Sequence, residues 1–292
     1  IASGAAPRQW PGGPVPDGVL VLRTVEDCLA IRERLRSRPR VVVVGGGFIG
    51  AEVAASCRPL GLDVVLVTKS AGLLRSALGE EMAQRWAELH RAHGVDLRDG
   101  VGVDAIVGGG RVEAVRLTDG SQLPADLVLV GLGVTPAVGW LDGSGLRLDD
   151  GVVCDATGAA DGCTNVVAAG DVARWWHPLY ERHLRIEHWE HAARQGEVAA
   201  RTLLAGPQGG DTFDEVPYFW SDQYDVKLQM LGLPTDYDAL EIVEGDPDEW
   251  QFVAAYGRAG HTIAVLGTTP GRAHAYHDAI ADRAEFPPKQ PD

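Results

Sequence analysis

Residues 41–70 read VVVVGGGFIGAEVAASCRPLGLDVVLVTKS. Two short and continuously apolar runs, at 41–44 and 64–67, flank a segment with helical periodicity that stops at Gly61. Strands without polar interruption are typical of a parallel sheet that is covered on both faces. The stretch therefore predicts one βαβ unit.

The glycines between the first strand and the helix fill the pattern G-x-G-x-x-G, with Gly45, Gly47 and Gly50. The first glycine permits a tight turn, the second lets a pyrophosphate approach the backbone, and the third lets the helix pack close to the strand. The phosphates are then expected at the positive N-terminus of the helix. Because the motif lies in a complete βαβ unit, it predicts a dinucleotide site; the alternative is a purely structural glycine turn.

The end of the second strand favours one nicotinamide coenzyme over the other. An NAD site usually has Asp or Glu there, which accepts hydrogen bonds from the ribose 2′-OH. Here Thr68 holds that position, followed by Lys69 and Ser70. An ammonium group and two hydroxyls can receive a 2′-phosphate, which favours NADPH, although phosphate sites more often use Arg. The alternative is a solvated Lys69 and a relaxed preference.

The segment TVEDCLAIRERLRS predicts a helix before the βαβ unit. Thr24 is placed as its N-cap, with Asp27 three residues later. Leu29, Ile31 and Leu35 follow as an apolar stripe that we expect to face the core.

The remaining elements follow from periodicity and turn residues. Residues 79–94 predict a helix closed by a glycine, and 111–131 predict a hairpin that turns at an Asp-Gly pair and returns to the parallel sheet. A helix over 189–205 is expected to end at Gly206. From about residue 214 the pattern changes to short strands, VKLQMLG, ALEIVE, QFVAAYG and TIAVLG, with one late helix near RAHAYHDAIADR. This predicts a separate α+β module.

The composition limits the function classes. At 292 residues with 45% apolar content, the chain is expected to hold more than one domain. Acids outnumber bases 41 to 26, for a net charge of −15, which argues against nucleic acid as a partner. No apolar run is long enough to cross a bilayer, so we expect a soluble, cytoplasmic protein with no membrane contact.

The four cysteines are Cys28, Cys57, Cys154 and Cys163. Because none forms a C-x-x-C pair, neither a redox disulfide nor an iron–sulfur cluster is expected, and buried free thiols are the simpler interpretation. A G-x-S-x-G elbow is also missing, so hydrolysis has no support in the sequence.

Several blocks in one order resemble the oxygenase-coupled ferredoxin reductases, which are flavoproteins of the pyridine-nucleotide-disulfide superfamily. The blocks are ASGAAPR, LRTVEDC, VVVVGGGFIGAEVAA, GLGVTP, VVAAGDVARW, RIEHWEHAARQG and VPYFWSDQYDVKLQ. The resemblance covers nearly the whole chain, and it implies FAD and NAD(P)H as cofactors.

The resemblance implies a domain order in which a nicotinamide domain interrupts an FAD domain. Residues 1–15 would end the first FAD half, 16–135 would form the NAD(P)H-binding domain, and 136–209 would form the second FAD half. Residues 210–292 would form an α+β domain for flavin contact and dimerisation. The predicted fold class is therefore α/β, with a Rossmann-type domain, a partial FAD domain and a C-terminal α+β domain.

The first residue is Ile1 rather than Met. We therefore expect a fragment that lacks the leading segment of such reductases, with its FAD-binding G-x-G-x-x-G. Without that segment the ADP half of FAD would have no cradle, and flavin would be held weakly or not at all.

The resemblance also gives roles to single residues. Asp171 would bind the FAD ribitol, although as a residue after a strand it also suits a helix N-cap. Arg23 would reach FAD, Trp189 would lie near the flavin, and Glu52 would lie beside the nicotinamide. The module from residue 210 would contact the isoalloxazine through Phe219, Trp220 and Ser221. The rest of the expected cofactor-binding set is Gly4, Arg8, Phe48, Ile49, Gly133, Gly170 and His188.

Two motifs have simpler alternatives. Large aromatic residues are core residues more often than cofactor partners, which applies to Trp175, Trp176, Trp189 and Trp220. The spacing of the histidines in HLRIEHWEH, His183, His188 and His191, suggests a metal, but zinc needs three or four converging ligands and H-E-x-x-H is missing. We therefore expect no metal, and we expect His274 and His277 on the surface.

The function that these residues favour is transfer of electrons from NAD(P)H through FAD to a small iron–sulfur protein, a two-iron ferredoxin or a rubredoxin, that serves an oxygenase. No protein acid or base is obligatory for hydride transfer, and Glu52, Glu187 and Trp189 are the nearest catalytic candidates. Two alternatives stay open: a flavin-dependent NAD(P)H oxidase, and a truncated nucleotide-binding module without turnover.

Charge bears on partner binding, because ferredoxins are acidic and so is this chain. Attraction would need a local basic patch, for which four residues near the presumed flavin edge are candidates: Arg174, Arg182, Arg185 and Arg194. The alternative is four ordinary surface arginines. A homodimer through the C-terminal domain is also expected from the resemblance.

Overall fold

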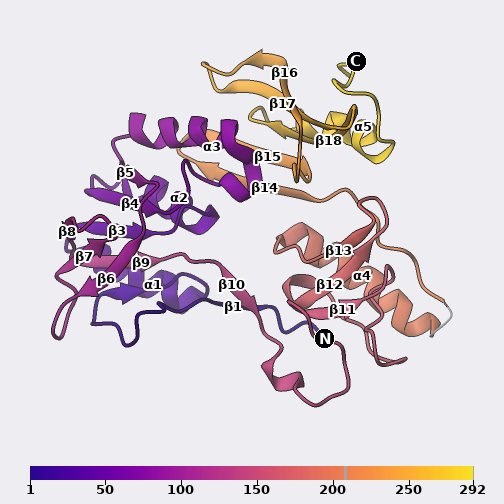
Figure 1. Ribbon diagram of the computed structural model, residues 1–292, viewed down its shortest axis with the longest axis horizontal. Helices are drawn as coiled ribbons and strands as arrows, with labels where there is room; N and C mark the ends of the chain where they lie inside the picture. Colours follow the sequence, from indigo (N-terminus) through magenta and orange to yellow (C-terminus); the bar gives the residue numbers. More distant parts are fainter. Residues whose placement is uncertain (207–208, 292) are drawn as a thin grey trace. The chain divides into compact units, whose positions relative to one another are not determined.

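The computed structural model of the chain describes residues 1–206 and 209–291. The chain divides into two compact units. Unit 1 contains Ile1–Ala6, Thr135–Trp220 and Lys227–Asp292, and unit 2 contains Pro7–Val134 and Ser221–Val226. Each unit is built around its own sheets and core (Figure 1).

The main sheet of unit 2 has five strands in the order β2-β9-β3-β4-β5, and every neighbouring pair is parallel. The strands are β2 (Val19–Leu20), β3 (Val41–Val44), β4 (Val64–Thr68), β5 (Asp96–Asp99) and β9 (Leu127–Val130). All four residues of β3 and of β9 are buried. The predicted parallel sheet and its central βαβ unit are confirmed, because only a sheet covered on both faces buries such uninterrupted valine runs.

Helix α1 (Val25–Leu35) has the predicted capping box, since Thr24 accepts from the Asp27 amide and Asp27 accepts from the Thr24 amide. The predicted apolar stripe is wrong in part. Ile31 is buried, but Leu29 is 47% exposed and Leu35 is only half-buried. Ile31 and Leu35 are four residues apart and share a helix face, whereas Leu29 lies on another side of the helix and does not reach the core.

Two further helices belong to unit 2, α2 (Phe48–Cys57) and α3 (Arg75–Ala92). The helix expected over 79–94 is confirmed, but an extra turn precedes it from Arg75. Gly79, at φ 77°, interrupts the helical backbone between that turn and the rest. Gly94, at φ 81°, follows the helix end as expected from its freedom to adopt a positive φ.

A small antiparallel sheet completes unit 2, in the order β6-β7-β8. It consists of β6 (Val103–Val107), β7 (Ala114–Leu117) and β8 (Gln122–Pro124). The hairpin between β7 and β8 turns at Asp119 and Gly120, and the chain then returns to the parallel sheet through β9, which confirms the prediction. Strand β10 (Val134–Pro136) pairs with β1 (Ala5–Pro7) where the chain enters and leaves this unit.

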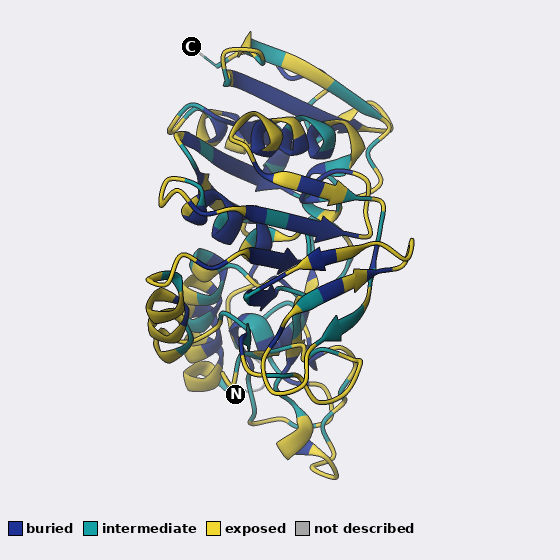
Figure 2. Ribbon diagram, turned by 90° about the vertical axis from the view of Figure 1, so that its left-hand side faces the viewer, coloured by how far each residue is buried: buried dark blue, intermediate teal, exposed yellow. Residues whose placement is uncertain are grey.

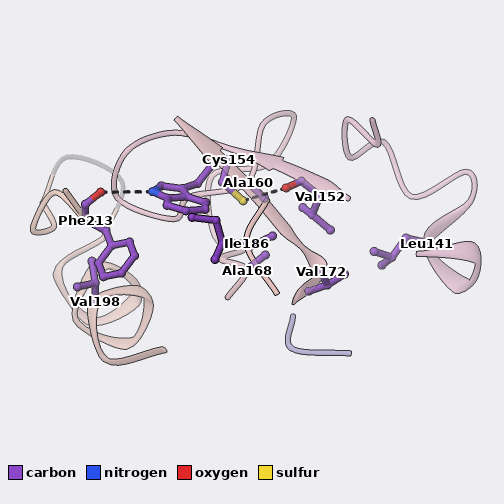
Figure 3. Packing of buried hydrophobic residues seen from close by; sticks show 11 residues of the cluster. Leu141, Val152, Cys154, Ala160, Ala168, Val172, Ile186, Val198 and Phe213 are labelled. Carbon is purple, nitrogen blue, oxygen red and sulfur yellow. Dashed lines mark hydrogen bonds between the residues drawn. The ribbon is translucent and has the colours of Figure 1, made fainter. Parts of the chain in front are cut away.

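One half of unit 1 is a three-stranded sheet, β11-β12-β13, with helix α4. Its elements are η1 (Gly139–Leu141), β11 (Val152–Cys154), η2 (Gly170–Val172), β12 (Ala173–His177), β13 (Arg182–Leu184) and α4 (Trp189–Ala205). Trp175 is fully buried in the core of this half, and its Nε1 donates to the Phe213 carbonyl at 3.3 Å. Phe213 and Ile186 belong to the same core (Figure 3). Helix α4 ends at Gly206 as predicted.

The other half of unit 1 is a five-stranded antiparallel sheet with a short helix, which confirms the predicted α+β module. Its order is β14-β15-β18-β17-β16. The elements are β14 (Tyr218–Gln223), β15 (Val226–Gly232), β16 (Ala239–Asp246), β17 (Gln251–Arg258), β18 (His261–Gly267), η3 (Ala273–Tyr276) and α5 (His277–Ala281). Strand β14 escaped the prediction because its residues are mostly aromatic and polar, although they alternate between buried and less buried positions.

Buried residues concentrate on the strands and on the inner sides of the helices (Figure 2). The expectation of four buried thiols is only half right: Cys57 and Cys154 are buried, Cys28 is exposed and Cys163 is half-buried, and all four are free. Among the described helices, none combines the length and apolar character needed to cross a bilayer.

Candidate nucleotide and flavin sites

The glycine loop of unit 2 is shaped by close backbone contacts. A Cβ on Gly45 would lie 2.1 Å from the Gly131 carbonyl oxygen, and a Cβ on Gly50 would lie 1.9 Å from the Gly45 carbonyl oxygen. Both positions are therefore closed to any larger residue. A Cβ on Gly47 would meet no atom within 4 Å, so this glycine has open space in front of it.

The same glycine is the N-cap of α2, and no side chain caps the helix there. An N-terminus without a side-chain cap and with open space at Gly47 suits an anionic ligand at the positive end of the helix dipole. A pocket of about 390 Å³ opens beside the loop. The pocket is lined by five of the expected residues, Gly45, Gly47, Thr68, Lys69 and Gly133. It is also lined by Trp10 and Leu132, which no sequence motif indicated. Closed glycines, an uncapped helix and a pocket fit a dinucleotide pyrophosphate.

The carboxyl end of β4 carries the residues that bear on coenzyme choice. Thr68 is 7% exposed, and its Oγ1 accepts from the Ser70 amide at 3.3 Å. Lys69 and Ser70 are exposed. A second pocket, of about 410 Å³, is lined by Gly46, Gly47, Thr68, Ser70, Arg75 and Ser76.

Arg75 and Ser76 were not expected at this site. They belong to the first turn of α3, and the sequence signal for that helix begins only at Gly79. The Arg75 guanidinium contacts Glu80 at 2.8 Å, but both side chains stay substantially exposed. An Arg beside the end of β4 is the residue type that phosphate sites more often use.

Glu52 lies on α2 and is half-buried. Its Oε1 accepts a hydrogen bond from the Ser221 hydroxyl at 2.6 Å, within unit 2. Burial raises the pKa of Glu52, the Ser221 hydrogen bond lowers it, and the nearby Asp222 raises it. A partly desolvated carboxylate held by one hydroxyl suits a position beside a reacting ring.

The remaining expected residues of unit 2 lie outside the pocket beside the glycine loop. Phe48 and Ile49 are the first residues of α2. Phe48 is half-buried, and Ile49 is 42% exposed. Arg8 donates through its backbone to Gly133 and through Nε to Val134 at 3.0 Å. Arg23 precedes α1, and its amide donates to Asp27.

In unit 1, the expected flavin residues gather at the N-terminus of α4. Helix α4 packs against η2, which contains Gly170 and Asp171. His188 is the N-cap without a side-chain hydrogen bond, and Trp189 is the first helical residue. Asp171 lies close enough to His188 to raise the pKa of its ring, although burial dominates and lowers this pKa to about 4. The Phe219 ring contacts the His188 ring at a centroid distance of 4.6 Å, with the two planes tilted by 50°.

Two buried polar atoms at this place, His188 Nδ1 and Gln195 Nε2, have no hydrogen-bond partner among the described residues. The other end of the Gln195 amide accepts from the Gly170 amide at 2.8 Å. Because buried polar groups are normally satisfied, these atoms and the uncapped helix fit a polar ligand such as the ribitol and pyrimidine of FAD. Gln195 was not anticipated from the sequence.

The aromatic residues divide into two kinds. Trp175 is a core residue, as the simpler alternative had it, but Trp189 is 76% exposed, Trp220 is 40% exposed and Trp176 is 39% exposed. A tryptophan at the start of α4 that packs into no core is available to a ligand. Gly4, in contrast, precedes β1, and its carbonyl accepts from Ala137.

The histidines of the HLRIEHWEH segment do not converge. His183 is half-buried and its ring contacts Trp176, whereas burial lowers the pKa of His191 to about 3. Over 1–206 and 209–291, no cluster of three or more potential metal ligands is found. His274 and His277 are exposed, as expected.

The expected basic patch is wrong for at least half of its members. Arg174 is paired with Asp149, and Arg185, only 10% exposed, is paired with Asp150 at 3.2 Å and with Glu187 at 2.5 Å. Arg194 lies 4.0 Å from Glu215. Acids therefore balance the charges of Arg174 and Arg185, whereas the Arg194 side chain stays 53% exposed. Glu187, a catalytic candidate, is likewise engaged in an ion pair.

Residues 1–196 match the family model described as pyridine nucleotide-disulphide oxidoreductase, and residues 218–291 match the model described as reductase C-terminal. The chain is 40% identical over 278 residues to the ferredoxin–NAD(+) reductase component of an anthranilate 1,2-dioxygenase system from Burkholderia cepacia, covering 93% of this chain and 66% of that protein.

Two solved structures are also similar. The ferredoxin reductase of the CYP199A2 system from Rhodopseudomonas palustris matches with a TM-score of 0.91 and 31% identity, over 100% of this chain and 72% of that one. A covalent putidaredoxin reductase–putidaredoxin complex matches with a TM-score of 0.87 and 33% identity. The match covers 97% of this chain and 68% of that chain. The chain spans 66%, 63% and 61% of the length of three of its relatives.

Proposed function

We propose that this chain, which belongs to the pyridine nucleotide-disulphide oxidoreductase family, passes electrons from NAD(P)H through FAD to a two-iron ferredoxin or a rubredoxin that serves an oxygenase. The observation that carries the proposal is the uncapped α2 N-terminus at Gly47, open to a pyrophosphate and adjoining a pocket. The relatives support the acceptor, because one is named for a ferredoxin–NAD(+) reductase and one structure is a complex with putidaredoxin.

The chain's own residues would bind and orient two nucleotides. The amides at the start of α2 would hold the coenzyme pyrophosphate, and Glu52 would lie beside the nicotinamide. Asp171 and the N-terminus of α4 would hold the flavin end of FAD, with the exposed Trp189 ring covering it from water. Bound FAD would supply the conversion of a two-electron hydride donor into a one-electron donor.

We also propose that the coenzyme is NADPH. Lys69, Ser70, Arg75 and Ser76 surround the end of β4, where a carboxylate would select NADH. An ammonium and a guanidinium together give a 2′-phosphate two charged donors. A homodimer through the C-terminal domain stays a prediction, as do the domain boundaries.

The test is a comparison of electron acceptors with the full chain loaded with FAD. We expect NADPH oxidation with ferricyanide and with a two-iron ferredoxin, and only slow oxidation in oxygen alone. Fast oxygen-dependent turnover without a ferredoxin response would instead identify an oxidase. Failure to retain FAD or to oxidise NADPH with any acceptor would identify a nucleotide-binding module and overturn the proposal.

A further inference from the structure

A chain of hydrogen bonds leads away from Glu52 through the interior of unit 2. The Ser221 hydroxyl donates to Glu52 Oε1 at 2.6 Å, and Gln223 Nε2 donates to Ser221 Oγ at 3.0 Å. Gln223 Oε1 lies 2.8 Å from His90 Nε2, and the Tyr224 hydroxyl lies 3.1 Å from His90 Nδ1. Ser221, Gln223 and His90 are at most 1% exposed. We call this chain the Glu52 tether.

All donors in the tether point toward Glu52. The single proton of Ser221 is used on Glu52, so Ser221 must accept from the amide nitrogen of Gln223, and the amide oxygen faces His90. Burial lowers the pKa of His90 to about 4, so the ring is neutral near neutral pH and has one donor and one acceptor. Its Nε2 therefore carries the proton, and its Nδ1 accepts from Tyr224.

The tether joins segments that are far apart in the chain but belong to one compact unit. Glu52 is on α2 and His90 is on α3, whereas Ser221, Gln223 and Tyr224 form the end of β14 and the turn after it. Tyr224 is the first residue of the two-residue turn between β14 and β15, and it has a positive φ of 57°.

That conformation places the Tyr224 ring on His93, with a centroid distance of 3.7 Å and an interplanar angle of 12°. The ring position in turn lets the hydroxyl reach His90. A positive φ is usual at this position of a two-residue hairpin turn, and here it also serves these two side-chain contacts.

We propose that Ser221, Gln223 and His90 are positioning residues for the nicotinamide: through the tether they orient the Glu52 carboxylate so that its second oxygen accepts a hydrogen bond from the nicotinamide carboxamide. The inference rests on the proposed function, since it needs a nicotinamide beside Glu52. Glu52 Oε2 makes no hydrogen bond within the described part of the chain, so it is available for this contact. A carboxylate fixed at one oxygen loses less freedom when it binds through the other.

The charged groups around the tether set how it responds to pH. Asp222 and burial raise the pKa of Glu52, and the Ser221 hydrogen bond opposes them. His93 acts on His90, and Arg58 acts on Tyr224. Removal of the Ser221 hydroxyl would therefore raise the pKa of Glu52, so Glu52 would become protonated at a higher pH.

The test compares Ser221→Ala, Ser221→Thr and the unaltered full chain by calorimetric titration with NADPH and with 2′-phospho-ADP-ribose, which is NADPH without its nicotinamide. We expect Ser221→Ala to weaken NADPH binding on the order of tenfold, the effect of one oriented charge-assisted hydrogen bond. As the pH is lowered, NADPH binding by Ser221→Ala should also be lost at a higher pH than in the unaltered chain, because Glu52 becomes protonated earlier. Ser221→Thr should restore both, and binding of the fragment should not change.

Three outcomes would overturn the inference. Equal losses for NADPH and for the fragment would indicate general damage to the unit. An unchanged affinity and pH profile in Ser221→Ala would show that the tether has no effect on coenzyme binding. A full Ser221→Ala effect in a Glu52→Gln background would show that the effect does not pass through Glu52. If the unaltered chain bound neither ligand, the proposed function itself would fail, and that result is distinct from the others.

Discussion

At the residue scale, the proposed preference for NADPH over NADH depends on a few side chains at the end of β4. Thr68 packs beneath the glycine loop, where a Cβ on Gly46 would lie 2.7 Å from its Oγ1. Thr68 is thus a packing residue first. The residues that can meet a ribose or its phosphate are the exposed Lys69 and Ser70, with Arg75 from the next helix.

Lys69→Glu is expected to lower kcat/KM for NADPH on the order of tenfold, because it removes one charge-assisted hydrogen bond to the 2′-phosphate and adds a repulsive charge. The value for NADH should stay the same or rise. Steady-state rates with ferricyanide measure both. Arg32→Glu, an exposed substitution on α1 with the same change of charge, is the control. Parallel losses for both coenzymes would exclude a phosphate site at Lys69.

At the element scale, the glycines of the loop have two different roles, close packing of α2 and space for a ligand. Gly50 lets α2 lie against the loop after β3, whereas Gly47 leaves space for a ligand. Both roles follow from the motif because glycine spacing is a local property of the chain. The tether could not be predicted in this way, since His90 and Gln223 are 133 residues apart and only the folded unit brings them together.

Two matched substitutions separate these tasks. Gly50→Ala should destabilise the protein by about 1–3 kcal/mol, because its Cβ would press on the Gly45 carbonyl and push α2 outward. Gly47→Ala should leave the free energy of unfolding nearly unchanged but abolish detectable coenzyme binding. Urea denaturation and calorimetric titration of both variants check this. A stable Gly50→Ala, or a Gly47→Ala that binds normally, would contradict the assigned roles.

At the scale of the whole molecule, periodicity and turn residues anticipated most elements of both units. They failed at Leu29, whose spacing places it off the buried face of its helix. They also failed where contacts with distant segments decide the outcome, as for Cys28 and for Arg174 and Arg185, which are paired with acids. Buried histidines are a further feature that local patterns did not reveal. Burial lowers the pKa of His90 and His188 to about 4, from an ordinary 6.5.

These histidines make stability depend on pH. Between their folded pKa of about 4 and the ordinary 6.5, the unfolded chain binds more protons than the folded one. The contribution of each histidine to the free energy of unfolding should therefore be complete above pH 6.5. It should decrease by about 1.4 kcal/mol per pH unit as the pH drops below that value. Denaturation at several pH values tests this. His90→Gln should reduce the slope and His274→Gln, an exposed control, should not; equal slopes in all three proteins would contradict the assignment.

If the proposed function holds, electrons from a nicotinamide coenzyme leave this chain one at a time. Anaerobic titration of the FAD-loaded full chain with NADPH, followed by oxidised two-iron ferredoxin, measures this. We expect NADPH to bleach the flavin absorbance, and the absorbance to recover as two ferredoxins are reduced for each coenzyme oxidised. A flavin that NADPH does not bleach, or a bleached flavin that passes nothing to ferredoxin, would contradict it.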